Sequence, residues 1–303
     1  MLLSKLPAIF IASTLALAAP RVDNVLEKMV PPDANSLVGA RMDVIKSTSL
    51  YQKLIAAQKL PQMDQFAGDT GFDPRRDVRE LLFVTTGSRG RVLLARGAFH
   101  PNPEVLKGVR KTRHGQYEIW GQENGGFCIL DSSLAAAGDV EAIKDALDEW
   151  TSGTHTTGPK LISRASGVGE RAQIWGYSTG LPTFLVDNIP KASTGIDFSR
   201  IFKGLEDVWF EADLSAGLLA NVRGTTASDQ DAINLRDAVR GLVGLGRLSV
   251  PEKTPELLRL WDGISAEQSG RSVTLKGDIA QDLIEKLVEM LGAARPQVPR
   301  SRV

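Results

Sequence analysis

The sequence predicts an α+β protein built from two tandem units, each with mostly antiparallel strands and helices on one face. Amphipathic helices and β-hairpins follow one another in the same order twice along the chain. The dipeptide Gly138-Asp139 before the closing helix of the first unit corresponds to Gly277-Asp278 before the closing helix of the second. Each unit begins β-α-β-β-α-β, the ferredoxin-like order, and adds a strand and a helix, which gives β-α-β-β-α-β-β-α. We therefore expect a duplicated, ferredoxin-like-derived fold.

Residues 1–19 have the pattern of a secretory signal peptide. Lys5 supplies a positive charge, Leu6 to Leu17 form a short apolar stretch, and Ala16-Leu17-Ala18 matches the A-x-A cleavage signature. The stretch is shorter than the ~20 apolar residues of a membrane-spanning helix. We expect export to a periplasmic or extracellular location, with no transmembrane span after cleavage; the alternative is an uncleaved N-terminal anchor.

The first unit is expected over residues 20–150. It begins with a helix-like lead over 21–35, which ends at two prolines. Asp139 is placed to cap the closing helix, and Asp73-Pro74 is placed to start a short helix in a turn-rich stretch over 68–77. The other expected elements are a strand over 36–42, a helix over 50–60, a hairpin of 81–85 and 92–97, a helix over 104–111, strands over 117–120, 127–130 and 134–137, and the closing helix over 140–150.

Residues 151–170 are rich in Thr, Ser and Gly and are expected to form a linker. The second unit is expected over 171–292, and the tail 293–303 is expected to be disordered. The elements expected in the second unit are a strand over 172–176, a helix over 181–189, a hairpin of 208–214 and 218–224, a helix over 229–243, strand-like segments over 257–261 (alternatively a helix end) and 271–275, and a last helix over 279–291.

The charge balance argues against a nucleic-acid partner. The 303 residues contain 36 Lys+Arg and 36 Asp+Glu, so the formal net charge is zero. The single cysteine, Cys128, cannot form an intrachain disulfide and lies in an apolar run, where we expect a buried thiol. The five tryptophans fall mostly on expected strands, which favours core packing; two or more on an exposed face would suit a binding surface.

The segment Gly176-Tyr177-Ser178-Thr179-Gly180 matches the G-x-S-x-G motif of a nucleophile elbow, so Ser178 is a weak catalytic candidate. That motif requires a histidine later in the chain, and all three histidines precede it. A tight strand-to-helix turn is the simpler interpretation of the two glycines.

Other motifs do not have the spacing that their chemistry requires. The glycines of Gly241 to Gly246 are expected to end a helix and do not match the dinucleotide-binding pattern. Asp69, Asp73 and Asp77 are four residues apart, unlike the alternating ligands of a calcium loop. We expect no metal, no cofactor and no catalytic constellation, although a carboxylate pair needs no local motif and stays possible.

Two stretches resemble uncharacterised exported bacterial proteins of the domain-of-unknown-function type. They are Thr70 to Val78, followed by a hairpin, and Phe127 to Leu134, running into Ala137-Gly138-Asp139 and a helix. The resemblance covers mainly Ser36 to Trp150, and it implies the fold without bringing catalytic residues.

These observations favour a non-catalytic envelope or periplasmic protein that binds an envelope protein or a ligand. Export, duplication and the lack of a catalytic constellation support this interpretation. One alternative is a hydrolase that uses Ser178 or a carboxylate pair, and another is a structural subunit of an envelope assembly.

Overall fold

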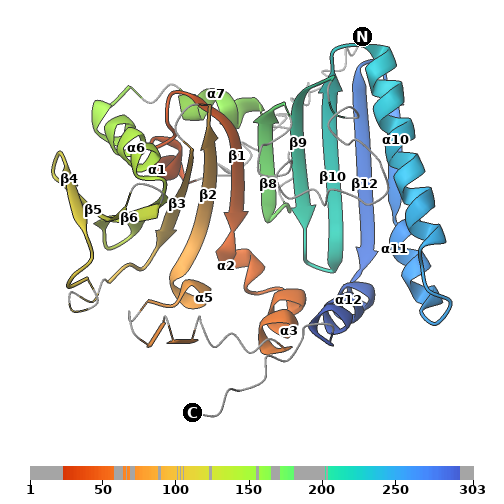
Figure 1. Cartoon of the computed structure of the whole chain (residues 1–303), viewed down its shortest axis with the longest axis horizontal. Coiled ribbons are helices and arrows are strands. Elements are labelled where there is room, and N and C mark those ends of the chain that lie inside the picture. The colour runs from red at the N-terminus through yellow and green to blue at the C-terminus, as the bar shows by residue number, and fades with distance from the viewer. Residues whose placement is uncertain are drawn as a thin grey trace, which may run out of the picture.

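The computed structural model describes residues 23–57, 64–65, 67–68, 72–87, 90–100, 102, 104, 106–122, 125–154, 157–164, 171–180, 202 and 204–293. Its strands form one sheet of twelve, in the order β11-β12-β10-β9-β8-β1-β2-β3-β7-β6-β5-β4 (Figure 1). The expected α+β class is confirmed. Every described strand pair is antiparallel. β1 pairs directly with β2, so the sheet does not show the split β-α-β order of ferredoxin-like units, in which another strand lies between the first two.

The N-terminal half of the sheet contains β1 to β7 and runs from the centre to one edge. Its strands are β1 (Ala34–Arg41), β2 (Val78–Thr86), β3 (Arg91–Gly97), β4 (Lys111–His114), β5 (Tyr117–Gln122), β6 (Gly125–Asp131) and β7 (Leu134–Gly138). Its helices are α1 (Asn24–Glu27), α2 (Met42–Ile45), α3 (Ser49–Ala57), α5 (Pro74–Asp77), α6 (Val140–Ser152) and α7 (Thr157–Arg164).

The C-terminal half joins the first through antiparallel pairing of β8 with β1, from Ser36↔Ser178 to Ala40↔Ile174. Its strands are β8 (Ile174–Thr179), β9 (Leu205–Asp213), β10 (Gly217–Thr226), β11 (Ile264–Ser269) and β12 (Ser272–Ala280). Its helices are α10 (Asp229–Leu248), a 3₁₀ turn (Pro255–Leu257), α11 (Leu258–Asp262) and α12 (Gln281–Ala293).

Two expected elements of regular structure were wrong. The described residues of 104–111 form turns that lead into β4, because Gly108 adopts φ +86°, a conformation that ends a helix. Residues 257–261 do not form a strand. They are helical, which agrees with the alternative interpretation of this segment. The helix expected over 181–189 lies outside the described residues.

The two glycine-rich motifs also differ from expectation. Residues 176–178 lie inside β8, so Ser178 is within a strand, and the residues that follow Gly180 lie outside the described part of the structure. The glycines at 241–246 lie inside α10, which continues to Leu248. Gly246 is needed for close packing, because a Cβ at this position would collide with the ring of Trp261 on α11.

Directly opposed residues of neighbouring strands share a face, so the registers assign every strand residue to one of two faces. We name them after the helices that cover them. The α6 face contains Leu82, Leu94, Ala136 and Cys128 in one row of pairs. These side chains form the main core with α1, α6 and α7.

The α10 face is the opposite side of the same sheet. A row of paired residues crosses it through Leu275, Val222, Phe210, Gly176, Val38, Phe83, Leu93, Ala137 and Phe127. In the C-terminal half, α10 packs on this face, with Ala232 and Leu235 against Val273 and Leu275. The covering helices α6 and α10 therefore lie on opposite faces of the two halves.

A contact between α3 and α12 also joins the halves, at the lower edge of the sheet in Figure 1. Lys53 Nζ lies 2.8 Å from Glu285 Oε1, and Ser49 Oγ donates a hydrogen bond to Gln281 Oε1 at 2.9 Å. Lys53 holds the pKa of Glu285 below its usual range. Residues more than 230 positions apart in the chain are thus neighbours here.

Candidate functional site: an apolar pocket on the α10 face

The α10 face of the N-terminal half is apolar, and a pocket with a volume of about 690 Å³ lies against it. Because α6 covers the opposite face, the side chains that form the floor of this pocket point away from the main core. The floor comes from β2, β3, β6 and β7, through Leu81, Leu93, Ala95, Phe127, Ile129, Ala135 and Ala137. The same strands therefore carry apolar side chains on both faces.

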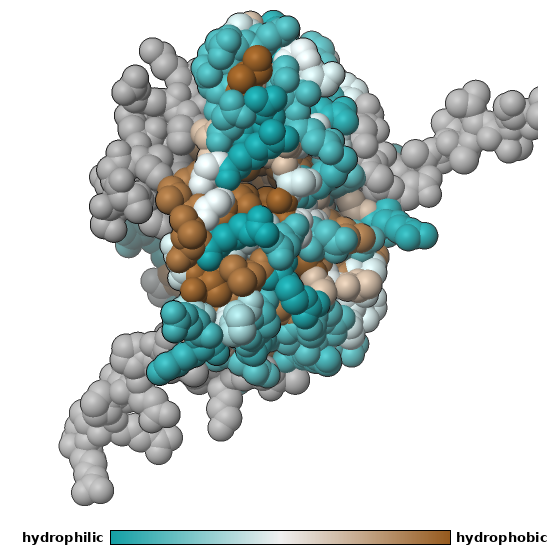
Figure 2. All heavy atoms as spheres, turned by 90° about the vertical axis from the view of Figure 1, so that its right-hand side faces the viewer, coloured by the Kyte–Doolittle hydropathy of each residue, from teal (hydrophilic) through white to brown (hydrophobic). Residues whose placement is uncertain are grey.

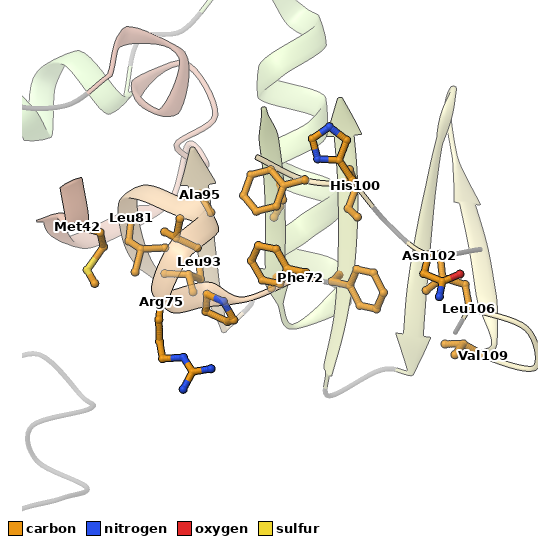
Figure 3. Close-up of a pocket in the computed structure, with 18 of the residues that line it drawn as sticks. Met42, Phe72, Arg75, Leu81, Leu93, Ala95, His100, Asn102, Leu106 and Val109 are labelled. Atoms are coloured by element: carbon orange, nitrogen blue, oxygen red, sulfur yellow. The ribbon is translucent and has the colours of Figure 1, made fainter. Parts of the chain in front are cut away.

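The walls come from short segments around this floor. Met42 of α2 and Tyr51 of α3 lie at one end, with Phe72, Pro74 and Arg75 from the start of α5. The other end is formed by the rim segment, which we define as the described residues between Asn102 and Arg110. Figure 3 shows Met42 and Arg75 at one end of the pocket and Asn102, Leu106 and Val109 at the other.

The α5 end of the pocket is fixed by an N-cap and a half-buried lysine. Asp73 Oδ1 accepts a hydrogen bond from the Arg75 N–H at 2.9 Å, so the expected cap is confirmed. Lys46 Nζ donates to the carbonyl oxygens of Arg76 and Val78, which ties α2 to α5, and burial lowers the pKa of this amine. The Phe72 and Phe99 rings lie 5.5 Å apart, centroid to centroid.

Arg75 is the one cation among the described lining residues, and its charge is already compensated. Its guanidinium donates to Asp73 Oδ2 at 2.9 Å and to Asp64 Oδ1 at 2.8 Å. The hydrogen bond from Arg75 holds the pKa of Asp73 below its usual range. In Figure 3 the guanidinium points away from the leucines of the floor. The interior of the pocket is therefore electrically neutral and offers mainly hydrocarbon contacts.

The uncovered face of the C-terminal half has the opposite character. Glu211, Asn221 and Lys276 are paired in one row across β9, β10 and β12 on the α6 face. They line a smaller hollow of about 390 Å³ with Arg171, Asp213 and Asp278. An antiparallel sheet with one polar face can leave that face in water. The polar hollow is thus an ordinary solvated sheet surface, whereas the apolar pocket is not.

Ser178 lies within β8 and is buried, with 3 % of its surface exposed. Its Oγ donates to the carbonyl oxygen of Thr179 at 3.5 Å, which is a weak hydrogen bond. Of the histidines that are described, His114 Nε2 lies 2.6 Å from Asp148 Oδ1 and His100 lines the pocket. The structure therefore pairs neither of them with Ser178.

Cys128 is a free and fully buried thiol, as expected from its apolar neighbours. Burial raises its pKa to about 11, so the thiol stays protonated at neutral pH. Asp73 and Asp77 bind Arg75 and Arg76 and are not grouped around a cation position. Among the described residues, no cluster of His, Cys, Asp or Glu has the arrangement of a metal site.

The tryptophans do not form an exposed binding surface, since all five are buried or half-buried. Trp120 stacks on Phe127 with ring centroids 5.5 Å apart, and Arg223 lies over the ring of Trp209. Exposed apolar side chains occur elsewhere, with Leu245 and Leu248 of α10 50 % and 85 % exposed. Figure 2 looks onto this side and shows hydrophobic residues gathered between hydrophilic ones. None of the described helices is long and apolar enough to span a membrane.

No sequence motif marks the pocket, because its lining residues come from separate segments of the chain. A signal was nevertheless present in the strands. The segments Val92 to Ala95 and Phe127 to Leu130 are continuous apolar runs, typical of strands that are buried on both faces. By contrast, the segment Val208 to Asp213 carries acidic residues at alternate positions. This difference indicates that the open face of the first half is apolar.

Comparisons with known proteins bear on the fold alone. No protein-family model matches the chain, and no curated protein is similar to it in sequence. The structure is similar to crystal form III of TP0453, with a TM-score of 0.53 and 10% identity, over 90% of this chain and 98% of that one. Crystal forms I and IV of TP0453 give TM-scores of 0.46 and 0.47, at 10% and 7% identity, over 89% and 86% of this chain and 98% and 95% of theirs.

Proposed function

We propose that the protein is a non-catalytic binding protein whose pocket holds the hydrocarbon part of a small ligand. One observation carries the proposal: where no described helix covers the sheet, the C-terminal half is polar but the N-terminal half is apolar. The sequence thus places charged residues on the open face of the C-terminal half and apolar residues over β2, β3, β6 and β7 of the N-terminal half. An apolar concave surface of this kind is typical of a ligand-binding site.

The dimensions and chemistry of the pocket are consistent with such a ligand. A volume of about 690 Å³ lies within the usual range of small-molecule sites, about 300 to 1,000 Å³. Each methylene group transferred from water into such a pocket contributes about 0.8 kcal/mol. A chain of several methylene groups could therefore bind without any strong polar contact.

A matched pair of variants at Ala137 tests the proposal. Ala137 lies on the pocket floor, opposed to Leu93 and Phe127 in neighbouring strands. Ala137→Phe would place a bulky ring on the pocket floor in the way of a ligand, whereas Ala137→Ser leaves the floor open. We expect a fluorescent polyene fatty acid to bind the wild type and the Ser variant, and to bind the Phe variant at least tenfold more weakly.

Thermal unfolding of the three proteins controls for damage to the fold. If the Phe variant is as stable as the wild type and still binds the probe equally well, the pocket is not the binding site. Absence of saturable binding to the wild type would contradict the proposed function itself.

We also infer that the protein is exported and acts in the periplasm or outside the cell. The support is the sequence pattern of residues 1–19, which lie outside the described part of the structure. Mass spectrometry of the protein recovered from its host tests this. A mature N-terminus near Ala19 is expected, and a full-length chain confined to the cytoplasm would contradict export.

A further inference from the structure

Few polar side chains line the apolar pocket. Among its described lining residues they are Tyr51, Arg75, His100 and Asn102. His100 and Asn102 are exposed, so water competes for any hydrogen bond that they offer to a ligand. Tyr51 and Arg75 are half-buried, and they are therefore the two candidates for binding a polar group that the ligand brings out of water.

The guanidinium of Arg75 is already bound by carboxylates of the protein. Its Nε and Nη2 donate to the two carboxylate oxygens of Asp73, each at 2.9 Å, and its Nη1 donates to Asp64 Oδ1 at 2.8 Å. An anionic ligand would have to compete with both carboxylates for this cation. Arg75 is therefore a poor counter-ion for a charged head group in the pocket.

The hydroxyl of Tyr51 forms no hydrogen bond with any residue in the part of the chain that the structure describes. The backbone N–H of the same residue donates to Thr48 Oγ1 at 3.2 Å, so only the side chain lacks such a partner. Burial raises the pKa of Tyr51, and the hydroxyl therefore stays protonated at neutral pH. It can donate one hydrogen bond to a ligand and accept another from it.

The position of Tyr51 on α3 is fixed from the opposite side of the helix. Ser49 and Lys53 are four residues apart, so they share one face of α3, and both contact α12 through Gln281 and Glu285. Tyr51 lies two residues from each of them, which places it on roughly the opposite side of the helix. The C-terminal half thus holds α3 by one face while Tyr51 lines the pocket with the other.

We propose that the ligand carries a neutral oxygen, a hydroxyl or an ester carbonyl, and that Tyr51 selects it by a hydrogen bond within the pocket. The inference rests on the proposed function, because it assumes that the pocket holds the hydrocarbon chain. A carboxylate at the same place would lose its hydration, and Arg75, the one cation among the described lining residues, is already paired. A wholly apolar ligand would leave the buried hydroxyl without a hydrogen bond.

Competition binding at pH 8 tests the chemistry of the head group. 1-Decanol, methyl decanoate, decanoate and 1-chlorodecane all carry a ten-carbon chain, and each would compete with the fluorescent fatty acid. We expect the alcohol or the ester to displace the probe at least fivefold more effectively than decanoate and 1-chlorodecane. Decanoate is charged at this pH, and the chlorine atom is a poor hydrogen-bond acceptor. The better of the two neutral compounds identifies the kind of oxygen that is bound.

Tyr51→Phe removes only the hydroxyl oxygen, and Tyr117→Phe is the matched control. Tyr117 lies on β5 outside the pocket lining, where its hydroxyl accepts a hydrogen bond from Gln116 Nε2 at 3.1 Å. In Tyr51→Phe the advantage of the preferred neutral compound over 1-chlorodecane is expected to shrink at least threefold, while 1-chlorodecane itself binds as it does to the wild type. Tyr117→Phe should keep the wild-type preference.

The possible results separate this inference from the proposed function. An unchanged preference in Tyr51→Phe would overturn the role of Tyr51, and decanoate as the strongest competitor would overturn the neutral head group. In both cases the hydrocarbon site stands as long as Ala137→Phe weakens binding of the probe. If no compound competes and Ala137→Phe changes nothing, the proposed function fails as well.

Discussion

Gly39 on β1 lies directly against the indole ring of Trp175 on β8, at the pairing that joins the two halves of the sheet. The two residues are opposed in the register, and Trp175 is 1 % exposed. A Cβ atom at Gly39 would overlap Cε2 and Nε1 of the indole. The absence of a side chain on β1 therefore creates the space that the buried tryptophan of β8 fills.

Gly39→Ala is expected to destabilise the protein by about 1 to 3 kcal/mol, because overpacking forces the tryptophan or the strand to move. Gly241→Ala is the control, since a Cβ there would meet nothing within 4 Å. In the interior of α10 the same substitution is expected to stabilise by up to about 1 kcal/mol. Chemical denaturation of both variants measures the two effects, and equal effects would contradict the packing described at Gly39.

The adjacent residues Leu93 and Leu94 of β3 test the assignment of the two faces. Leu94 is fully buried in the core on the α6 face, whereas Leu93 lines the pocket. Leu94→Ala is expected to cost about 2 to 5 kcal/mol, as in other well-packed cores. Leu93→Ala should cost less, because its side chain already borders open space. Denaturation curves that give the reverse order would overturn the face assignment.

The Asp73 cap is expected to make stability depend on acid. Asp73→Ala should cost about 1 kcal/mol through loss of the cap to the Arg75 N–H. Since Arg75 lowers the folded-state pKa of Asp73, the charged form stabilises the fold above the unfolded pKa, and that contribution is lost as the pH falls through the folded value. Asp73→Asn should keep the cap, so its stability should be lower than that of the wild type at neutral pH and equal to it in strong acid. Melting curves of both proteins across this pH range measure the difference.

The contribution of Glu80 to stability is expected to have the opposite dependence on pH. It accepts a hydrogen bond from the Asp23 N–H at 3.1 Å, and burial raises its pKa. Its ionised form is thus penalised in the folded state, so stability should fall as the pH rises from the unfolded pKa through the raised folded value. Glu80→Gln removes this loss. We expect the variant to be as stable as the wild type in acid and more stable at neutral pH. A difference in unfolding midpoint that does not change with pH would contradict this.

Local patterns in the sequence identified most strands and helices. The hairpin of β2 and β3, the cap at Asp73 and the buried position of Cys128 follow from apolar runs, turn residues and capping chemistry. Asp139 precedes α6 as expected, yet its carboxylate accepts a hydrogen bond from the Arg91 N–H at 2.8 Å instead of capping the helix. A contact between residues 48 positions apart outcompeted the local one.

The arrangement of the sheet and the pocket could not be predicted in the same way. Pairing of β1 with β8 joins two segments across most of the first half, and nothing in either strand specifies the other as its partner. Residues 104–111 were expected to be helical, but Gly108 turns the chain. The pocket depends on both features, so its residues are brought together by tertiary contacts alone.

The pairing of β1 with β8 also constrains how the chain can fold. Ser36 and Ser178 are partners across a loop of more than 140 residues, so this pairing closes late and at a high cost in loop entropy. Until β8 is available for pairing, β1 presents an apolar edge with unpaired backbone groups. Such an edge can bind another chain, so we expect this intermediate to depend on a holding chaperone until the two halves have joined.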